Sequence, residues 1–181
     1  GLSLIGFWVF VAIFAPYLTS YDPNALDYAM LADPTPSWIP WEDHWLGTDE
    51  LGRDVWSRLI WGSRTVLIVS PIAVGMAYLV GCTMGMLSGY LGGWVDMLIS
   101  RISDIILSFP VLILFIILIS TVGPSAFNII VAVTVASSPG IGRIVRGLIL
   151  DLRNHEYVDA AKIRGESALY IMVVELLPNA R

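Results

Sequence analysis

Three long stretches without a charged residue constrain the fold more than any other feature of this sequence. They cover residues 1–21, 65–95 and 105–142. A helix needs about 20 predominantly apolar residues to cross the hydrocarbon core of a bilayer, so each stretch can hold at least one span. Charged residues make up 14% of the chain and the mean hydropathy is +0.76, whereas soluble domains are about a quarter charged. The sequence therefore predicts an all-α, polytopic membrane protein.

The alternation of apolar and polar segments predicts about five spans. The stretch 105–142 would be about 57 Å long as one helix, nearly twice the hydrocarbon thickness, so we expect it to turn back at residues 121–125. The complete spans are then predicted at residues 2–18, 65–89, 96–120 and 126–148. A further apolar run begins shortly before Arg181, and no starting Met precedes Gly1. These ends predict a truncated fifth span and a piece of a longer membrane protein.

Residues 19–64 form the longest polar segment, and we expect them to connect the first two spans. Prolines exclude a long helix from the first part of the segment; they are Pro23, Pro34, Pro36 and Pro40. Thr48 or Asp49 is a suitable N-cap for an amphipathic helix that ends near Gly62. Its apolar stripe would consist of Leu51, Val55 and Leu59. Asp54 and Arg58 have the spacing of an ion pair along that helix. Capping and pairing, rather than catalysis, are the predicted roles of Asp49 and Asp54.

Small residues at every fourth position mark one face of the second predicted span. The series is Ala73, Ala77, Gly81, Gly85 and Gly89. Small side chains in this register allow another helix to approach closely. We therefore predict that this span packs against another helix inside a bundle. In the third predicted span, Arg101 and Asp104 are three residues apart and are predicted to form an ion pair.

A short polar helix is predicted at residues 154–165, between two apolar segments. Asn154 can cap its N-terminus, and Gly165 can end it in the left-handed conformation. About ten residues are too few for a stable isolated helix. Either the rest of the chain or a partner must therefore hold it.

The positions of Lys and Arg predict the orientation in the membrane. On one side the connections carry three basic residues, which are Arg53, Arg58 and Arg64. On the other side they carry six, which are Arg101, Arg143, Arg146, Arg153, Lys162 and Arg164. Basic residues are in excess on the cytoplasmic side of membrane proteins. The polar helix at 154–165 is therefore predicted to be cytoplasmic and the loop 19–64 extracytoplasmic.

Several functional classes lack the residues that they require. The single cysteine, Cys82, excludes an intramolecular disulfide, and the two histidines, His44 and His155, indicate no metal-binding path. An intramembrane enzyme such as a protease would need a Ser/His or paired-Asp arrangement at membrane depth, and the sequence shows none. A secondary transporter usually contains internal repeats, and none is evident. Phosphate-binding loops are also absent, so any ATP would have to be bound by other chains.

Two motifs resemble those of a known family. Asp159-Ala160-Ala161 followed by Gly165, and then by Leu177-Pro178, resembles the EAA loop of permease subunits in bacterial and archaeal ABC importers. The segment from His44 to Arg58 is similar to the signature of the dipeptide/oligopeptide/nickel permeases, and within them to the C-type subunit of the heterodimer. At the centre of this second match are Leu46, Gly47, Thr48, Asp49, Gly52, Arg53 and Asp54; His44, Ser57 and Arg58 belong to it too, and Gly62 and Arg64 follow. The pattern of Asp104 followed by Phe109-Pro110 fits as well.

The resemblance implies the fold of a type I ABC importer permease. Residues 1–18 would be the first transmembrane helix, 19–64 an extracytoplasmic loop and 65–181 a truncated permease core. The implied function is a non-enzymatic subunit that forms half of a translocation path for di- or oligopeptides, with nickel or another metal chelate as the alternative cargo. The implied partners are a second permease subunit, two ATP-binding subunits that hold ATP and Mg, and an extracytoplasmic solute-binding protein. The implied location is the cell membrane of a bacterium or archaeon.

Within this family the helix at 154–165 would be the coupling helix, which docks on an ATP-binding subunit, so the resemblance implies that a partner holds it. The implied coupling residues are Glu156, Tyr157, Asp159, Ala160, Ala161 and Gly165. Three positions depart from the family pattern. Asp159 replaces Glu, Arg164 stands at a usually apolar position, and Glu175 replaces Ile. An acid inside a span needs a partner, and we expect Arg181 or the cytoplasmic interface to supply it for Glu175.

Overall fold

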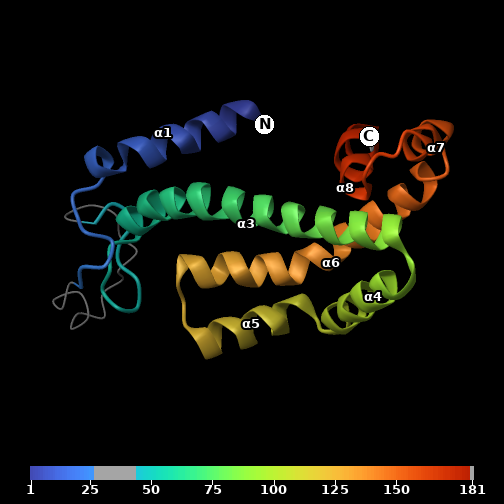
Figure 1. The fold of residues 1–181 in the computed structure, drawn as a ribbon. Helices are drawn as coiled ribbons and strands as arrows, with labels where there is room; N and C mark the ends of the chain where they lie inside the picture. Colours follow the sequence, from blue (N-terminus) through green and yellow to red (C-terminus); the bar gives the residue numbers. More distant parts are fainter. Residues whose placement is uncertain (27–43, 180–181) are drawn as a thin grey trace. The chain divides into compact units, whose positions relative to one another are not determined.

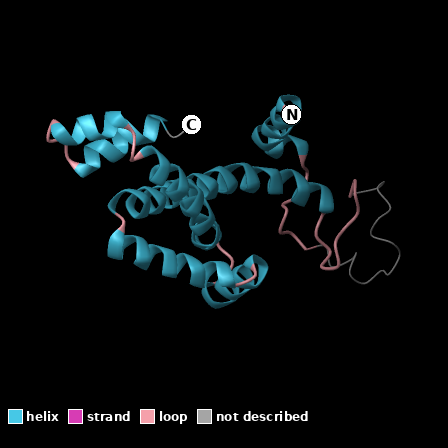
Figure 2. Ribbon diagram, turned by 90° about the vertical axis from the view of Figure 1, so that its right-hand side faces the viewer, coloured by secondary structure: helices cyan, strands magenta, loops and turns pink. Residues whose placement is uncertain are grey.

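The structure, a computed structural model, describes residues 1–26 and 44–179, and helices account for most of them (Figures 1 and 2). In chain order the elements are α1 (Leu2–Leu18), α3 (Val55–Leu91), α4 (Gly93–Ser108), α5 (Val111–Val122), α6 (Ala126–Leu152), α7 (Glu156–Ile163), α8 (Ala168–Tyr170), the π-helical segment η1 (Ile171–Leu176) and the 3-10 turn η2 (Leu177–Asn179). No strand lies within the described ranges. The predicted all-α class is confirmed. The chain divides within α3 into two compact units, Gly1–Ser70 and Pro71–Arg181.

Two of these helices, α3 and α6, are long and apolar enough to cross a membrane. The pair α4 and α5 passes the same test together and makes a third span if the bent pair is counted as one. Two further apolar helices, α1 and the run Ala168–Asn179, are shorter than this test requires. The apolar segments thus lie where the sequence predicts them, but only two or three meet the length of a full span among the described residues.

The second span is part of one continuous helix, which corrects the prediction of a separate amphipathic helix ending near Gly62. Helix α3 has 37 residues, about 55 Å at 1.5 Å per residue, so it extends well beyond a hydrocarbon core of about 30 Å. It begins at Val55 and not near Asp49, because the Asp54 carboxylate accepts a hydrogen bond of 2.7 Å from the backbone N–H of Ser57. Nothing near Gly62 interrupts the backbone hydrogen bonds of the helix, since glycine weakens a helix without ending it.

The third predicted span, residues 96–120, is broken into α4 and α5, which meet at 89°. Phe109 has φ −86° and ψ 135° and Pro110 caps α5. A residue before proline is driven into this extended conformation by the proline ring, so the helix ends there. The predicted reversal at 121–125 is confirmed, because α5 ends at Val122 and α6 begins at Ala126. The Ser125 hydroxyl accepts a hydrogen bond of 3.1 Å from the N–H of Asn128 and caps α6.

In the first unit, α1 packs against the beginning of α3. Val11, Ala15 and Ile60 form its buried apolar cluster. Two indole N–H groups fix the end of α1. Trp56 donates to the Leu18 carbonyl at 2.9 Å, and Trp61 donates to the Thr19 hydroxyl at 3.1 Å. The predictions for residues 27–43, which include Pro34, Pro36 and Pro40, lie outside the described residues.

In the second unit, the small-residue face of α3 lies directly against α6. A Cβ atom added to Gly81 would fall 2.7 Å from the Cβ of Ile141, and one added to Gly85 would fall 2.6 Å from the Gly142 carbonyl oxygen. At Gly89 the nearest atom would be the Cβ of Ile149, at 2.8 Å. No side chain fits at such distances. The two helices therefore approach at backbone separation, and α6 also carries the contacts to α4 and α5 (Figure 1). Ala73 and Ala77 of the same series are 2% and 3% exposed.

Candidate functional site

The polar helix near the end of the chain is α7, and different backbone conformations begin and end it. It starts after His155, whose φ of −79° and ψ of 150° are extended, so the predicted cap at Asn154 is wrong by one residue. The Asn154 amide instead donates to the Leu150 carbonyl at 3.2 Å. At the other end Gly165 has φ +80°. Its N–H bonds the Lys162 carbonyl at 2.9 Å, and the next N–H, that of Glu166, bonds the Ala161 carbonyl at 3.2 Å. This pair of bonds is a Schellman motif, and the predicted left-handed glycine is confirmed.

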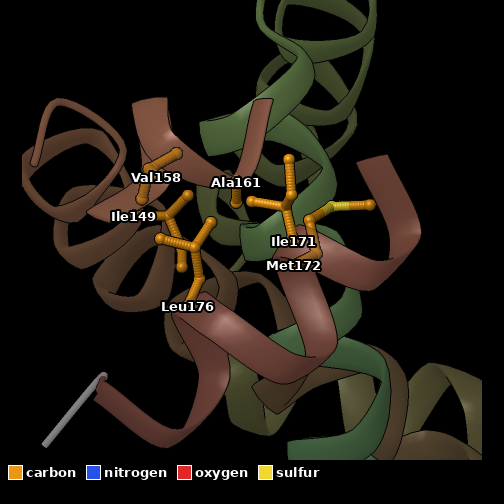
Figure 3. Close-up of a cluster of buried hydrophobic side chains, with 6 residues drawn as sticks. All are labelled: Ile149, Val158, Ala161, Ile171, Met172 and Leu176. Carbon is orange, nitrogen blue, oxygen red and sulfur yellow. The ribbon is translucent and has the colours of Figure 1, made fainter. Parts of the chain in front are cut away.

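An apolar cluster from the same chain holds α7 in place (Figure 3). Its six buried members are Ile149 of α6, Val158 and Ala161 of α7, and Ile171, Met172 and Leu176 of η1. Val158 and Ala161 are both 0% exposed. Burying an aliphatic side chain such as that of Val158 is worth about 1.5–3 kcal/mol, a contribution that stabilises a helix of eight residues that would be marginal alone. Of the two alternatives for holding this helix, the rest of the chain is therefore the one that supplies buried contacts. Contact with a partner stays a prediction.

The opposite face of α7 is exposed. It carries Glu156, Asp159, Ala160 and Ile163, which lie within two turns on one side of the helix. Ile163 is 87% exposed, an unusual state for a large aliphatic residue on a polar helix. The Lys162 ammonium lies 2.9 Å from the Asp159 carboxylate, so this charge pair flanks the apolar residue. Sequence reasoning missed Ile163, although an aliphatic residue outside the Val158–Ala161 stripe was a visible signal.

The structure divides the predicted coupling residues into two groups. Glu156, Asp159, Ala160 and Gly165 are exposed, whereas Ala161 is buried and Tyr157 is half-buried against the apolar cluster. The Tyr157 hydroxyl has no hydrogen-bond partner within the described part of the chain. Ala161 and the Tyr157 ring therefore hold α7 from inside, and the first group forms its exposed surface.

Two of the three residues that depart from the family pattern, Arg164 and Glu175, are bonded to one another. A guanidinium nitrogen of Arg164 lies 3.0 Å from a carboxylate oxygen of Glu175. The acid thus has a partner eleven residues earlier in the chain. The partner suggested from the sequence, Arg181, lies outside the described residues. Glu166 is farther away, with 3.8 Å between its carboxylate and the Arg164 guanidinium.

Helices α4 and α6 are joined by two ion pairs. Arg146 donates two hydrogen bonds of 2.6 Å to the Asp96 carboxylate, and Arg143 lies 2.8 Å from Asp104. The predicted pair of Arg101 with Asp104 is wrong, because the Asp104 carboxylate bonds across to α6 while Arg101 is exposed on α4. These two ion pairs link α4 to α6 and so fix the position of one helix along the other, which an ion pair within a single helix does not do.

The second motif forms a compact loop around Asp49. Its carboxylate accepts from the N–H groups of Leu51 and Arg53 at 2.9 and 3.0 Å and from the Arg53 guanidinium at 2.8 Å. The bond from the Arg53 side chain is the main reason that the pKa of Asp49 is lowered to about 2. Gly47 and Gly52 have φ of +72° and +73°, left-handed values that a side chain rarely adopts. Asp49 thus caps the loop rather than a helix.

A buried pair ties this loop to the start of α3. His44 Nδ1 lies 3.0 Å from the Asp54 carboxylate, and the two side chains are 5% and 3% exposed. The Asp54 carboxylate also caps α3, where it accepts a hydrogen bond from the N–H of Ser57. The predicted pair of Asp54 with Arg58 is therefore wrong, and the Arg58 guanidinium lies instead 3.6 Å from Asp49. Within residues 1–26 and 44–179, His, Cys, Asp and Glu form no group of three that could hold a metal ion.

Residues 81–181 match the family described as binding-protein-dependent transport system inner membrane component. The chain belongs to this family. The matched region contains α6, α7, η1 and the apolar cluster between them. This chain thus belongs to a family of inner membrane components of transport systems, as the resemblance implied.

Curated relatives of this transport component extend the likeness over nearly the whole chain. The dipeptide transport system permease protein DppC of Alkalihalophilus pseudofirmus is 40% identical over 99% of this chain and 58% of its own length. The probable D,D-dipeptide transport system permease protein DdpC of Escherichia coli is 39% identical over 98% of this chain and 58% of its own. The oligopeptide transport system permease protein OppC of Bacillus subtilis is 36% identical over 99% and 57%. The predicted resemblance to C-type peptide permeases is confirmed, and this chain spans somewhat more than half the length of these relatives.

Proposed function

We propose that this chain is part of a permease subunit of an ATP-driven ABC importer, in which it forms half of the path for di- or oligopeptides. The family supports membrane transport, and the names of the curated relatives support peptides as cargo rather than nickel. The subunit itself does no chemistry in this proposal. Two ATP-binding subunits supply ATP and Mg, a second permease subunit completes the path, and a solute-binding protein delivers the peptide.

The observation that carries the proposal is the two-sided construction of α7. One side is fixed to α6 and η1 by buried apolar side chains, and the other exposes Ile163, Ala160 and two acids. Close-packed interiors transmit displacement because they compress little. A protein that bound the exposed side and moved it would therefore move α6 and η1 as well. That is the mechanical requirement for a coupling helix driven by ATP-dependent motion of a partner.

The substrate is tested by transport in the complete system. The full-length permease would be assembled with its second permease subunit, ATP-binding subunits and solute-binding protein in proteoliposomes. Labelled dipeptides, longer peptides and a nickel chelate would be offered in turn. We expect ATP-dependent uptake of peptides and none of the chelate. Uptake of the chelate alone, or ATP hydrolysis stimulated only by an unrelated ligand, would overturn the peptide assignment.

The docking role of α7 is tested at Ala160, because a bulky residue at the buried Ala161 would also disrupt the apolar cluster. Ala160→Trp is expected to leave the permease inserted while ATP-dependent uptake falls by roughly tenfold or more, the effect of losing a central interface contact. Ala126→Trp is the matched control, since Ala126 is equally an exposed alanine but lies at the start of α6. Normal uptake and normal co-purification of the ATP-binding subunits with Ala160→Trp would remove α7 as the docking element.

A further inference from the structure

We propose that Arg164 and Glu175 are a positioning pair that fixes the end of α7 to η1 and passes the displacement of α7 into the helix that follows. This inference rests on the proposed coupling function and names two residues that nothing in the family motif assigns to it. The pair joins the C-cap of α7 to the π-helical segment across a distance of 3.0 Å between nitrogen and oxygen.

The backbone on each side of the pair is held firmly. Arg164 precedes the Gly165 turn, whose two hydrogen bonds fix its direction. Glu175 precedes Leu176, a fully buried member of the apolar cluster. The Glu175 carbonyl also accepts a hydrogen bond of 2.7 Å from the Asn179 amide, within the short turn η2. Both charged groups therefore project from segments whose backbone is held by hydrogen bonds or by a buried neighbour, and the ion pair links these two segments.

The pair complements the apolar cluster. Val158 and Ala161 fix the inner face of α7 to α6 and η1, but neither lies at its C-terminal end. Arg164 supplies an attachment there, directed at η1. A π-helical turn is rare and often lies at functional sites. The ion pair between Glu175 and Arg164 sets the direction in which η1 moves when α7 is displaced.

Stability alone does not account for the pair. Arg164 and Glu175 are 53% and 24% exposed, and exposed ion pairs contribute little to folding. A contact of small energetic value that bridges two rigid segments is suited to setting geometry.

Charge reversal in the complete complex tests the proposal. Peptide uptake and ATP hydrolysis would be measured together for R164E, E175R and the double variant. We expect each single variant to lower the peptide transported per ATP by roughly threefold or more, within the range by which single residues alter coupling between sites. The double variant restores the pair with its charges exchanged and is expected to recover most of the ratio. Glu166→Gln is the matched control, because it removes a carboxylate near Arg164 without touching the pair.

A second measurement separates this proposal from the proposed function. Amide hydrogen exchange of residues 171–177 would be followed in the full-length permease, without any substrate. R164E is expected to accelerate exchange in η1, and the double variant to slow it again. If the wild-type complex transports no peptide, the proposed function fails, and the exchange result still decides the pair. Unchanged exchange and an unchanged transport ratio in the single variants, or no recovery in the double variant, would overturn the positioning role.

Discussion

The loop at residues 44–54 and the helix α7 are both short motif segments, but they are held by opposite kinds of interaction. The loop is organised by charges and backbone hydrogen bonds around Asp49 and by the buried pair of His44 with Asp54. Helix α7 is organised by buried aliphatic side chains from α6 and η1. The partners of Asp49 and Asp54 lie within ten residues of them, whereas the partners of Val158 are as distant as Leu176.

This difference determines what each segment responds to. A loop held by local polar contacts is sensitive to charge and pH but not to the packing of remote helices. A helix held by remote apolar contacts is sensitive to side-chain volume and moves with the elements that it packs on. The second property is the one that a coupling element needs. The following changes test the comparison in order of decreasing expected effect.

Leu176→Ala removes a buried side chain from the apolar cluster that holds α7. Leu176 is fully buried, and removing such a side chain usually costs about 2–5 kcal/mol because a cavity remains. Chemical unfolding of the full-length permease in detergent measures this loss. Leu169→Ala is the control, since Leu169 is 68% exposed and its truncation should cost no more than about 0.5 kcal/mol. Equal effects of the two variants would show that the cluster does not hold α7.

Asp54→Ala removes polar contacts that hold the loop at residues 44–54. It removes the cap of α3 and one hydrogen-bond partner of the buried His44, with an expected cost of about 1–3 kcal/mol. Hydrogen exchange should accelerate in the loop and in the first turn of α3 while α7 stays protected. Glu50→Ala changes an exposed neighbouring acid and should leave exchange unaltered. Accelerated exchange in α7 would show that the two segments are not independently held.

Gly165→Ala measures the free-energy cost of the left-handed backbone conformation at the end of α7. No atom lies within 4 Å of an added Cβ there, but φ is +80°, so the cost of about 1–2 kcal/mol comes from the left-handed conformation alone. The same change at Gly75 is the control, because that glycine lies inside α3 with equally open space. Gly75→Ala should stabilise the helix by about 0.5–1 kcal/mol. A loss of stability in both variants would contradict the backbone explanation.

The loop alone should respond to acid through Asp49. Its folded pKa of about 2 lies below the ordinary value of 3.8, so the ionised form is favoured by folding. The resulting stabilisation is complete above pH 3.8 and disappears as the pH falls toward 2. Exchange of the Leu51 and Arg53 amides, followed between about pH 5 and pH 2, should accelerate relative to α7. In Asp49→Asn this acid-dependent difference should vanish, and its persistence would assign the effect to another group.

The local rules in the sequence predicted a large part of the backbone. The apolar stretches predicted α1, the later part of α3 and the reversal between α5 and α6. The break at Pro110 was predictable too, since a proline after Phe109 excludes a continuous helix, but the apolar run concealed it. The small-residue series indicated a close helix contact, whereas its neighbour, α6, is known only from the structure.

The sequence alone determined the features that depend on neighbouring residues. Examples are the all-α class and the left-handed conformation of Gly165 that ends α7. Such features follow from backbone sterics and hydrophobic period, which act within a few residues. Only the tertiary structure decided that α7 is held by its own chain, that Ile163 faces outward, and that Arg164 bonds Glu175. Each of these depends on which remote side chains the folded path brings together. No local pattern contains that information, because the same short helix could be held by any complementary apolar surface.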